Sequence, residues 1–177
     1  MSYIYDMVQN TRQKYNLIQS DPYALLDAMS VTVRESYNYG VDGLKGYCLS
    51  VDNTDFVVLN GKLLPPEKRI IACHEAAHLI LHKDIIKNGF IGDYSLFDTT
   101  SETEYEANAF TADFLISDND VISLAAENDM DYFSICKALS VNPALLNFKL
   151  SGMKNRGFHV NLPSPPDSSF LRKAGFA

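Results

Sequence analysis

The spacing of apolar residues predicts two helices at the start of the chain. Residues 3–18 carry apolar side chains at positions that share one helical face. The stretch SDPYALLDAMS begins a second helix, because Asp21 suits the N-cap and Pro22 suits the first helical position. Beyond this point the apolar pattern changes from helical spacing to alternation.

A small sheet is expected after these helices. The stretches VTVRESYNYG, GLKGYCLSV and DFVVLNG are short, rich in β-branched and aromatic residues and bounded by turn residues, which is typical of strands. Asp52, Asn53 and Thr54 separate the last two stretches and suit a hairpin loop. We therefore predict about three strands, with DFVVLN as an exposed edge that can pair with an extended peptide segment.

Helices are predicted for most of the remaining chain. LLPPEKRIIACHEAAHLILHKD forms a long and largely apolar helix, with Pro65–Pro66 at its start. Residues 84–100 lack a regular pattern. The capping-box sequence SETE then begins a helix that ends near Ser117. Shorter helices are expected near 119–127, 130–139 and 143–154.

Together these elements predict an α+β fold. We expect residues 1–157 to form one domain that ends in a helical hairpin, and residues 158–177 to form a loose tail. A length of 177 residues with a hydrophobic share of 46% is enough to build a packed core.

Charge and cysteine content narrow the classes of function. A formal charge of −7 argues against direct nucleic-acid binding, and no apolar run approaches the length of a membrane span. The N-terminus is polar and lacks the apolar core of a signal peptide. Cys48, Cys73 and Cys136 are odd in number and far apart, as expected of free thiols in a reducing compartment. We therefore expect a cytoplasmic protein that does not bind membranes.

The stretch CHEAAHLILH carries the clearest chemistry in the chain. His74 and His78 are four residues apart and share a helix face, so two imidazoles can reach one metal ion. Glu75 projects to the neighbouring face, where a carboxylate can accept a proton from water at the metal. This HExxH pattern is typical of zinc metallopeptidases. The alternative, a helix with accidental histidines, is weakened by the apolar residues on both sides of the motif.

His82 continues the same spacing, but it is not expected to bind the same ion. His74 and His82 are about 12 Å apart along a helix axis, whereas a zinc–nitrogen bond is only about 2 Å. His82 is therefore predicted to contact a ligand residue, to interact with the helix C-terminus or to be purely structural.

A third metal ligand is expected from the helix SETEYEANAFTADFL, since a catalytic zinc usually has three protein ligands. Glu106 lies one turn before Phe110 on the apolar stripe, so its carboxylate is predicted to point inward and bind the metal. The capping box explains Glu104, and the helix dipole explains Glu102. Asn108 is a candidate to hydrogen-bond a ligand residue and fix its orientation.

The two helices together resemble the ImmA/IrrE family of metallo-endopeptidases. HEAAHLILH and the later EYEANAFTADFLIS are similar to that family's HExxH helix and its E-x-E-A-N-x-F-A helix. The chain departs from the family at Ala77, where glycine is frequent, and at Ser117, where proline is frequent. The matching positions are His74, Glu75, His78, Glu104, Glu106, Ala107, Asn108, Phe110 and Ala112.

Over residues 20–150, the resemblance implies a zincin-like fold of the gluzincin type. In such a fold the small sheet packs on the HExxH helix and on the second ligand helix. The resemblance also implies Glu106 as the third ligand, and proteolytic activity.

The resemblance further implies a class of substrate. Relatives often act as antirepressors of phages or mobile elements and cut a helix-turn-helix repressor, so such a repressor is the expected partner. The expected chemistry is peptide hydrolysis assisted by one zinc ion, with Glu75 as the base and manganese as an alternative metal. A further donor should stabilise the oxyanion, and the candidates are Tyr94, Tyr105 and His159.

Two alternatives stay open at this point. The stretch FSICKALSVNPALLNFKLSGMKNRG is either a helix-turn-helix that contacts DNA or a repressor, or an αα-hairpin that packs on the catalytic helices. The acidic total charge favours the hairpin. The protein itself is either a peptidase or a non-catalytic module that senses metal or holds a repressor by contact. Glu75 distinguishes these two, because only a peptidase needs it as a proton acceptor.

Overall fold

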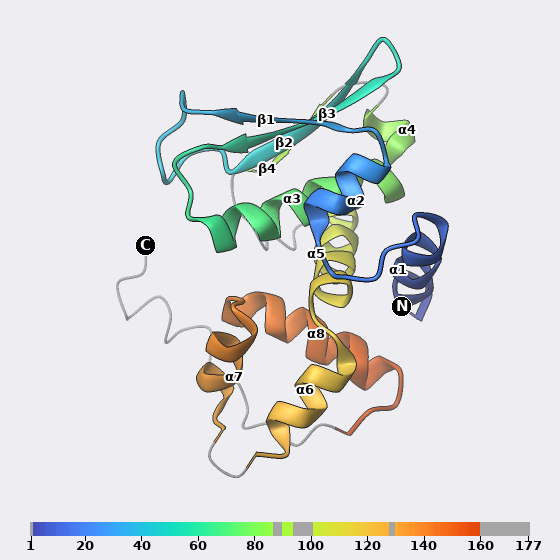
Figure 1. Ribbon diagram of the computed structural model, residues 1–177, viewed down its shortest axis with the longest axis vertical. Coiled ribbons are helices and arrows are strands. Elements are labelled where there is room, and N and C mark those ends of the chain that lie inside the picture. The colour runs from blue at the N-terminus through green and yellow to red at the C-terminus, as the bar shows by residue number, and fades with distance from the viewer. Residues whose placement is uncertain (1, 87–89, 94–100, 128–129, 160–177) are drawn as a thin grey trace.

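The computed structural model has a sheet half and a helical half, with α5 and α8 between them (Figure 1). It describes residues 2–86, 90–93, 101–127 and 130–159. The α+β class expected from the sequence is confirmed. In chain order the elements are α1 (Ser2–Lys14), α2 (Pro22–Ala28), β1 (Thr32–Ser36), β2 (Gly46–Val51), β3 (Thr54–Asn60), α3 (Pro65–Leu81), α4 (Lys83–Ile86), β4 (Phe90–Asp93), α5 (Glu102–Leu115), α6 (Asp118–Ala125), α7 (Tyr132–Leu139) and α8 (Pro143–Asn155).

Local sequence signals determine where several of these elements begin. The Asp21 carboxylate accepts a hydrogen bond from the backbone N–H of Tyr23 at 3.0 Å and caps α2. Asp52 and Asn53 have φ values of 49° and 61°, which form a two-residue hairpin turn between β2 and β3. Pro65 occupies the first position of α3, where its missing N–H costs no hydrogen bond.

The sheet is mixed, and its strand order differs from the order along the chain. The strands lie side by side in the order β1, β3, β2, β4, with β1 parallel to β3 and the other pairs antiparallel. β3 is therefore an inner strand, so the prediction that DFVVLN forms an exposed edge is wrong. β1 and β4 are the edges of the described sheet.

β4 is a strand that the sequence pattern does not indicate. It lies in the segment 84–100, which the sequence alone predicts to be irregular. Its residues Phe90–Asp93 pair with Gly46–Leu49 of β2. The strand exists because β2 offers it hydrogen-bonding groups, and a four-residue segment with a glycine has too little pattern of its own to predict it.

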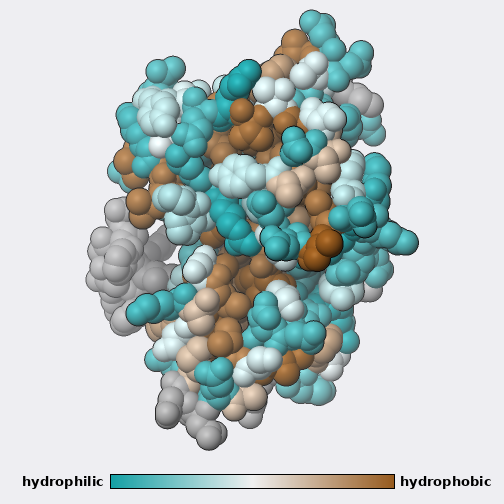
Figure 2. Space-filling view, in the orientation of Figure 1, coloured by the Kyte–Doolittle hydropathy of each residue, from teal (hydrophilic) through white to brown (hydrophobic). Residues whose placement is uncertain are grey.

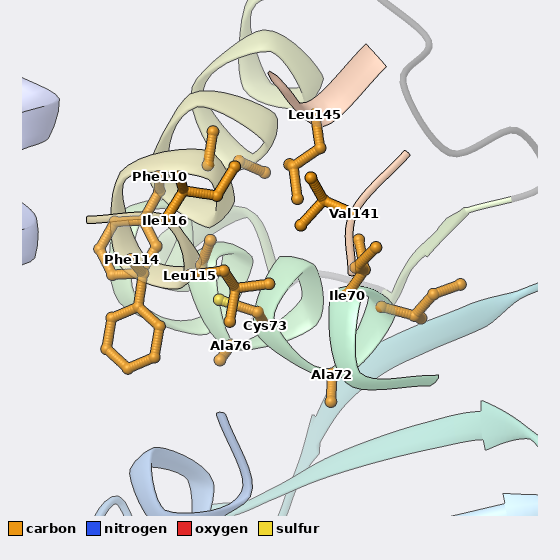
Figure 3. Packing of buried hydrophobic residues seen from close by; sticks show 14 of the residues in the cluster. Ile70, Ala72, Cys73, Ala76, Phe110, Phe114, Leu115, Ile116, Val141 and Leu145 are labelled. Atoms are coloured by element: carbon orange, nitrogen blue, oxygen red, sulfur yellow. The ribbon is translucent and has the colours of Figure 1, made fainter. Parts of the chain in front are cut away.

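α3 lies between the sheet and α5, and its composition allows both contacts. Ala72, Cys73, Ala76 and Ala77 are fully buried, and these small side chains let neighbouring elements approach the helix closely. Larger side chains of α5 and α8, such as Phe110, fill the adjacent space (Figure 3).

On the face shown in Figure 2, apolar side chains gather in a band down the middle of the molecule, between polar side chains.

Lys149 of α8 and Arg156, the C-cap residue of this helix, form ion pairs within the protein, whereas Lys154 is exposed. Lys149 is 1% exposed, and its ammonium group lies 2.8 Å from Asp113 of α5 and 2.6 Å from Asp118 of α6. Arg156 pairs with the same two carboxylates, at 3.2 Å and 2.6 Å. α8 therefore packs on α5 through a network of buried charges, which is the arrangement expected of a hairpin that packs on the catalytic helices.

Three further predictions concern the whole chain. The cysteines Cys48, Cys73 and Cys136 are free, as predicted, and the structure shows that all three are buried. Burial raises the pKa of the Cys73 thiol to about 12. Among the described residues, no helix combines the length and the apolar composition that a bilayer span requires. Most of the predicted tail, residues 160–177, lies outside the described residues, so the domain boundary after 157 stays a prediction.

Candidate metal centre

Two histidine rings of α3 converge on one point. His74 and His78 are both fully buried, and their Nε2 atoms lie 3.0 Å apart. The rings meet edge to face, with centroids 4.7 Å apart. Helical spacing places both side chains on one face, as the sequence predicts. Two nitrogen lone pairs directed at one buried point are an arrangement that a cation stabilises.

Glu104 of α5 completes this convergence. Its carboxylate oxygens lie 3.1 Å from Nε2 of His74 and 3.4 Å from Nε2 of His78. The three ligand atoms all lie within 4.8 Å of one another. Ligand atoms around a tetrahedral zinc with bonds of about 2.0 Å are roughly 3.3 Å apart, so these side chains fit such an ion.

The two histidines also set the charge state of this carboxylate. Burial by itself would raise the pKa of Glu104, but hydrogen bonds with His74 and His78 hold the pKa well below its usual range. Glu104 is therefore an anion at neutral pH. An anion beside two imidazoles is the charge state that binding to a divalent metal requires.

The sequence predicts that Glu106 is the third ligand, but the structure places Glu104, and not Glu106, against the histidine pair. Ser101 caps α5 alone, because its hydroxyl accepts the backbone N–H of Glu104 at 3.2 Å. The Glu104 side chain is not needed for the cap and turns towards the histidines. Glu106 instead lies beside His82, with Oε2 at 2.9 Å from its Nε2.

A signal for Glu104 exists in the sequence, but it is easily missed. Asn108 and Thr111 follow Glu104 at helical spacing, and both are fully buried. Three polar residues along one face therefore point into the protein. Such a buried polar stripe favours a site over a solvated helix start. Whether Asn108 orients a ligand residue stays a prediction.

His82 lies behind His78 rather than beside the ligand atoms. It is the C-cap residue of α3, is 6% exposed, and its Nδ1 lies 3.0 Å from Nδ1 of His78. His78 thus presents Nε2 to the metal centre and Nδ1 to His82. Burial and the neighbouring His78 lower the pKa of His82 to about 4, so His82 is neutral at physiological pH. Within the described residues, the group of potential ligands contains His74, His78 and Glu104 but not His82.

Glu75 points from α3 towards the sheet. Its side chain is fully buried and hydrogen-bonds with the Cys48 thiol of β2. Burial, followed by the Glu75 carboxylate, raises the pKa of that thiol. Glu75 directly follows His74 on α3, so the carboxylate held against the sheet belongs to the same helical turn as a residue of the candidate metal centre. No sequence pattern indicates Cys48 as a neighbour of Glu75, because the contact joins distant parts of the chain.

Gly46 lets β2 approach α3 at this position. A Cβ atom at Gly46 would lie 2.5 Å from Cγ2 of Ile71 and 3.3 Å from Oε1 of Glu75. The first distance is shorter than real carbon contacts, so a larger residue must displace the Ile71 side chain, the strand or the helix. Glycine is required here for space rather than for an unusual backbone conformation.

We therefore expect Gly46→Ala to destabilise the protein by about 1–3 kcal/mol, the usual cost of overpacking, and to displace Glu75. Urea unfolding measures the change in free energy of unfolding. Gly40→Ala is the matched control, since no atom lies within 4 Å of a Cβ built there. Equal stabilities for the two variants would contradict the close approach of β2 to α3.

Tyr105 and His159, two of the three candidates to stabilise the oxyanion, lie in separate parts of the described structure. The Tyr105 ring packs against Phe148 of α8, with centroids 5.4 Å apart. His159 is exposed and lies three residues after Arg156, which pairs with Asp113 at the far end of α5. Neither is brought to the histidine pair by these contacts. Tyr94 lies outside the described residues.

One family model matches the chain over residues 29–151, which is more than half of its length. The family is Peptidase_M78, described as an IrrE N-terminal-like domain. The match includes the HExxH helix and the helix that carries Glu104. No curated protein matches the chain.

Proposed function

The chain belongs to the Peptidase_M78 family, with an IrrE N-terminal-like domain, and from this premise we propose that it is a zinc-dependent endopeptidase. The observation that carries the proposal is the convergence of His74, His78 and Glu104 on one point, with Glu75 adjacent on the same helix. Two imidazoles and one carboxylate are a ligand set typical of catalytic zinc, which leaves one position open. Manganese is an alternative metal for the same ligands.

Each residue of the site has a distinct role in this proposal. When bound, zinc would act as a Lewis acid towards a peptide carbonyl and a water molecule. His74, His78 and Glu104 would hold the ion. Glu75 accepts the proton of the attacking water and passes it to the departing amine. Burial of Glu75 keeps the carboxylate away from bulk water and in a fixed position.

We propose that the substrate is a repressor protein with a helix-turn-helix domain. Support comes from the resemblance to the ImmA/IrrE family, whose members often act as antirepressors of phages or mobile elements. A flexible segment of such a repressor can extend and pair with β4, which is an edge of the described sheet. β4 pairs with β2, the strand that carries Gly46 and Cys48 near Glu75.

The experiment combines the purified protein with the helix-turn-helix repressor encoded beside its gene. We expect two repressor fragments in the presence of zinc, intact repressor with excess chelator, and renewed cleavage when zinc is restored. Gel electrophoresis and mass spectrometry identify the fragments and the cut bond. An intact repressor that nevertheless releases its DNA on mixing would contradict cleavage and would indicate antirepression by contact.

A further inference from the structure

A line of hydrogen-bonded side chains runs outward from the metal centre. Nδ1 of His78 lies 3.0 Å from Nδ1 of His82, and Nε2 of His82 lies 2.9 Å from Oε2 of Glu106. The other carboxylate oxygen of Glu106 accepts a hydrogen bond from the hydroxyl of Tyr3. Four residues thus form a continuous series, which we call the His82–Glu106 support: His78 of α3, its C-cap residue His82, Glu106 of α5 and Tyr3 of α1.

The proton positions along this series follow from the metal ligand at its inner end. If Nε2 of a neutral His78 faces a metal, then the ring carries its proton on Nδ1 and must donate it. Nδ1 of His82 is the acceptor within reach, so His82 carries its own proton on Nε2. That proton is donated to Glu106, whose carboxylate needs no proton of its own. Every hydrogen bond in the support is then satisfied in a single arrangement.

We propose that His82 and Glu106 are positioning residues that hold His78 in the tautomer and ring orientation needed for metal binding. The proposal rests on the proposed metal centre, but it assigns residues outside the ligand set. It also gives Glu106 a role that explains why a carboxylate lies at an inward-facing position of α5. Fixing a ligand ring from its far side strengthens metal binding, because the ring loses no freedom when the ion arrives.

The support extends beyond the family-matched region. Tyr3 belongs to α1, which precedes the matched residues 29–151. α1 is held along α5 by further contacts, since Arg12 donates to the backbone oxygen of Phe114 at 2.7 Å. Metal binding and the docking of α1 are therefore coupled through Glu106, and each should strengthen the other.

The test measures zinc affinity by competition with a chromogenic chelator, without any substrate. For His82→Phe we expect affinity to fall about 10–100-fold, as is usual when a residue that orients a metal ligand is removed. His82→Gln keeps an acceptor oxygen for His78 and should recover part of the loss. We expect about a tenfold loss for Glu106→Gln, and a smaller loss for Tyr3→Phe.

Matched controls are available on the same chain. His159→Phe and Glu102→Gln make the same chemical changes at exposed positions and should leave zinc affinity within about twofold of the wild type. A purely structural role would lower the melting temperature of the metal-free variants without changing zinc affinity. Melting curves of the metal-free proteins are therefore recorded in parallel.

Two results would overturn the proposal. One is a zinc affinity of His82→Phe equal to that of His159→Phe. If His82→Phe does not fold, the comparison moves to the partly exposed Glu106, and equal affinities for Glu106→Gln and Glu102→Gln overturn it instead. A wild-type protein that binds zinc but cuts no repressor would refute the proposed function and leave this inference intact. A wild-type protein that binds no zinc would refute both.

Discussion

Replacing Glu75 by glutamine is expected to abolish repressor cleavage while leaving the fold and zinc binding unchanged. Glutamine has nearly the same shape, so it can occupy the buried space between α3 and β2 and keep its contact with Cys48. An amide, however, cannot accept the proton of the attacking water. Loss of a general base costs about 10²–10⁴-fold in rate. Initial rates of repressor cleavage, measured with zinc present, give the size of the effect.

This variant also separates an enzyme from a metal-dependent binding protein. Zinc affinity and the melting temperature of Glu75→Gln should match those of the wild type, which shows that only the chemical step is lost. A variant that still relieves repression, with intact repressor, would contradict the peptidase mechanism. It would favour the alternative in which the protein holds its partner by contact.

Glu104→Gln is expected to cause the largest loss of zinc affinity among the glutamate variants of α5. The change removes a negative charge and an anionic ligand atom that lies 3.1 Å from His74. We expect a loss on the order of a hundredfold or more, above the 10–100-fold range typical of residues that only orient a ligand. Chelator competition on Glu104→Gln, Glu106→Gln and the exposed control Glu102→Gln ranks the three positions directly.

The order of these three affinities distinguishes two assignments of the third ligand. The structure predicts that Glu104→Gln binds zinc most weakly, Glu106→Gln moderately less tightly than the wild type, and Glu102→Gln normally. If Glu106→Gln lost zinc while Glu104→Gln kept it, the ligand expected from the sequence would be correct. The geometry around Glu104 would then be wrong.

The parts of the site that follow from short-range spacing could be predicted from the sequence. His74 and His78 share a face because four residues make about one helical turn, whatever surrounds the helix. The hairpin at Asp52 and Asn53 is equally local, since those residue types tolerate positive φ. The N-cap at Ser101 needs only a hydroxyl before a helix.

The choice between Glu104 and Glu106 depends instead on how α5 crosses α3. Both glutamates face inward, and the sequence of α5 alone does not reveal which one meets the histidine pair and which one meets His82. The capping-box pattern also misleads, because it assigns Glu104 to the helix end when the serine alone forms the cap. Relative helix placement depends on packing between distant parts of the chain, which local sequence patterns do not reveal.

The position of β3 has a similar explanation. Its sequence is that of a half-buried strand, which occurs both inside a sheet and at its edge. β1 pairs with β3 in parallel, although β2 separates the two along the chain. Strand order of this kind depends on the connection between residues 37 and 45, which has no distinctive pattern.

α5 carries Glu104, the proposed metal ligand, in its first turn and Asp113 near its last. Those two residues are nine positions apart, or roughly 13 Å along one helix. The far end anchors α8 through Lys149, and the near end places the Glu104 carboxylate beside His74. A helix of this length moves as a stiff rod. A macromolecule that binds the helical half and changes the tilt of α5 would therefore shift the Glu104 carboxylate. Binding at one end of the molecule would then alter the metal affinity at the other end of the same helix.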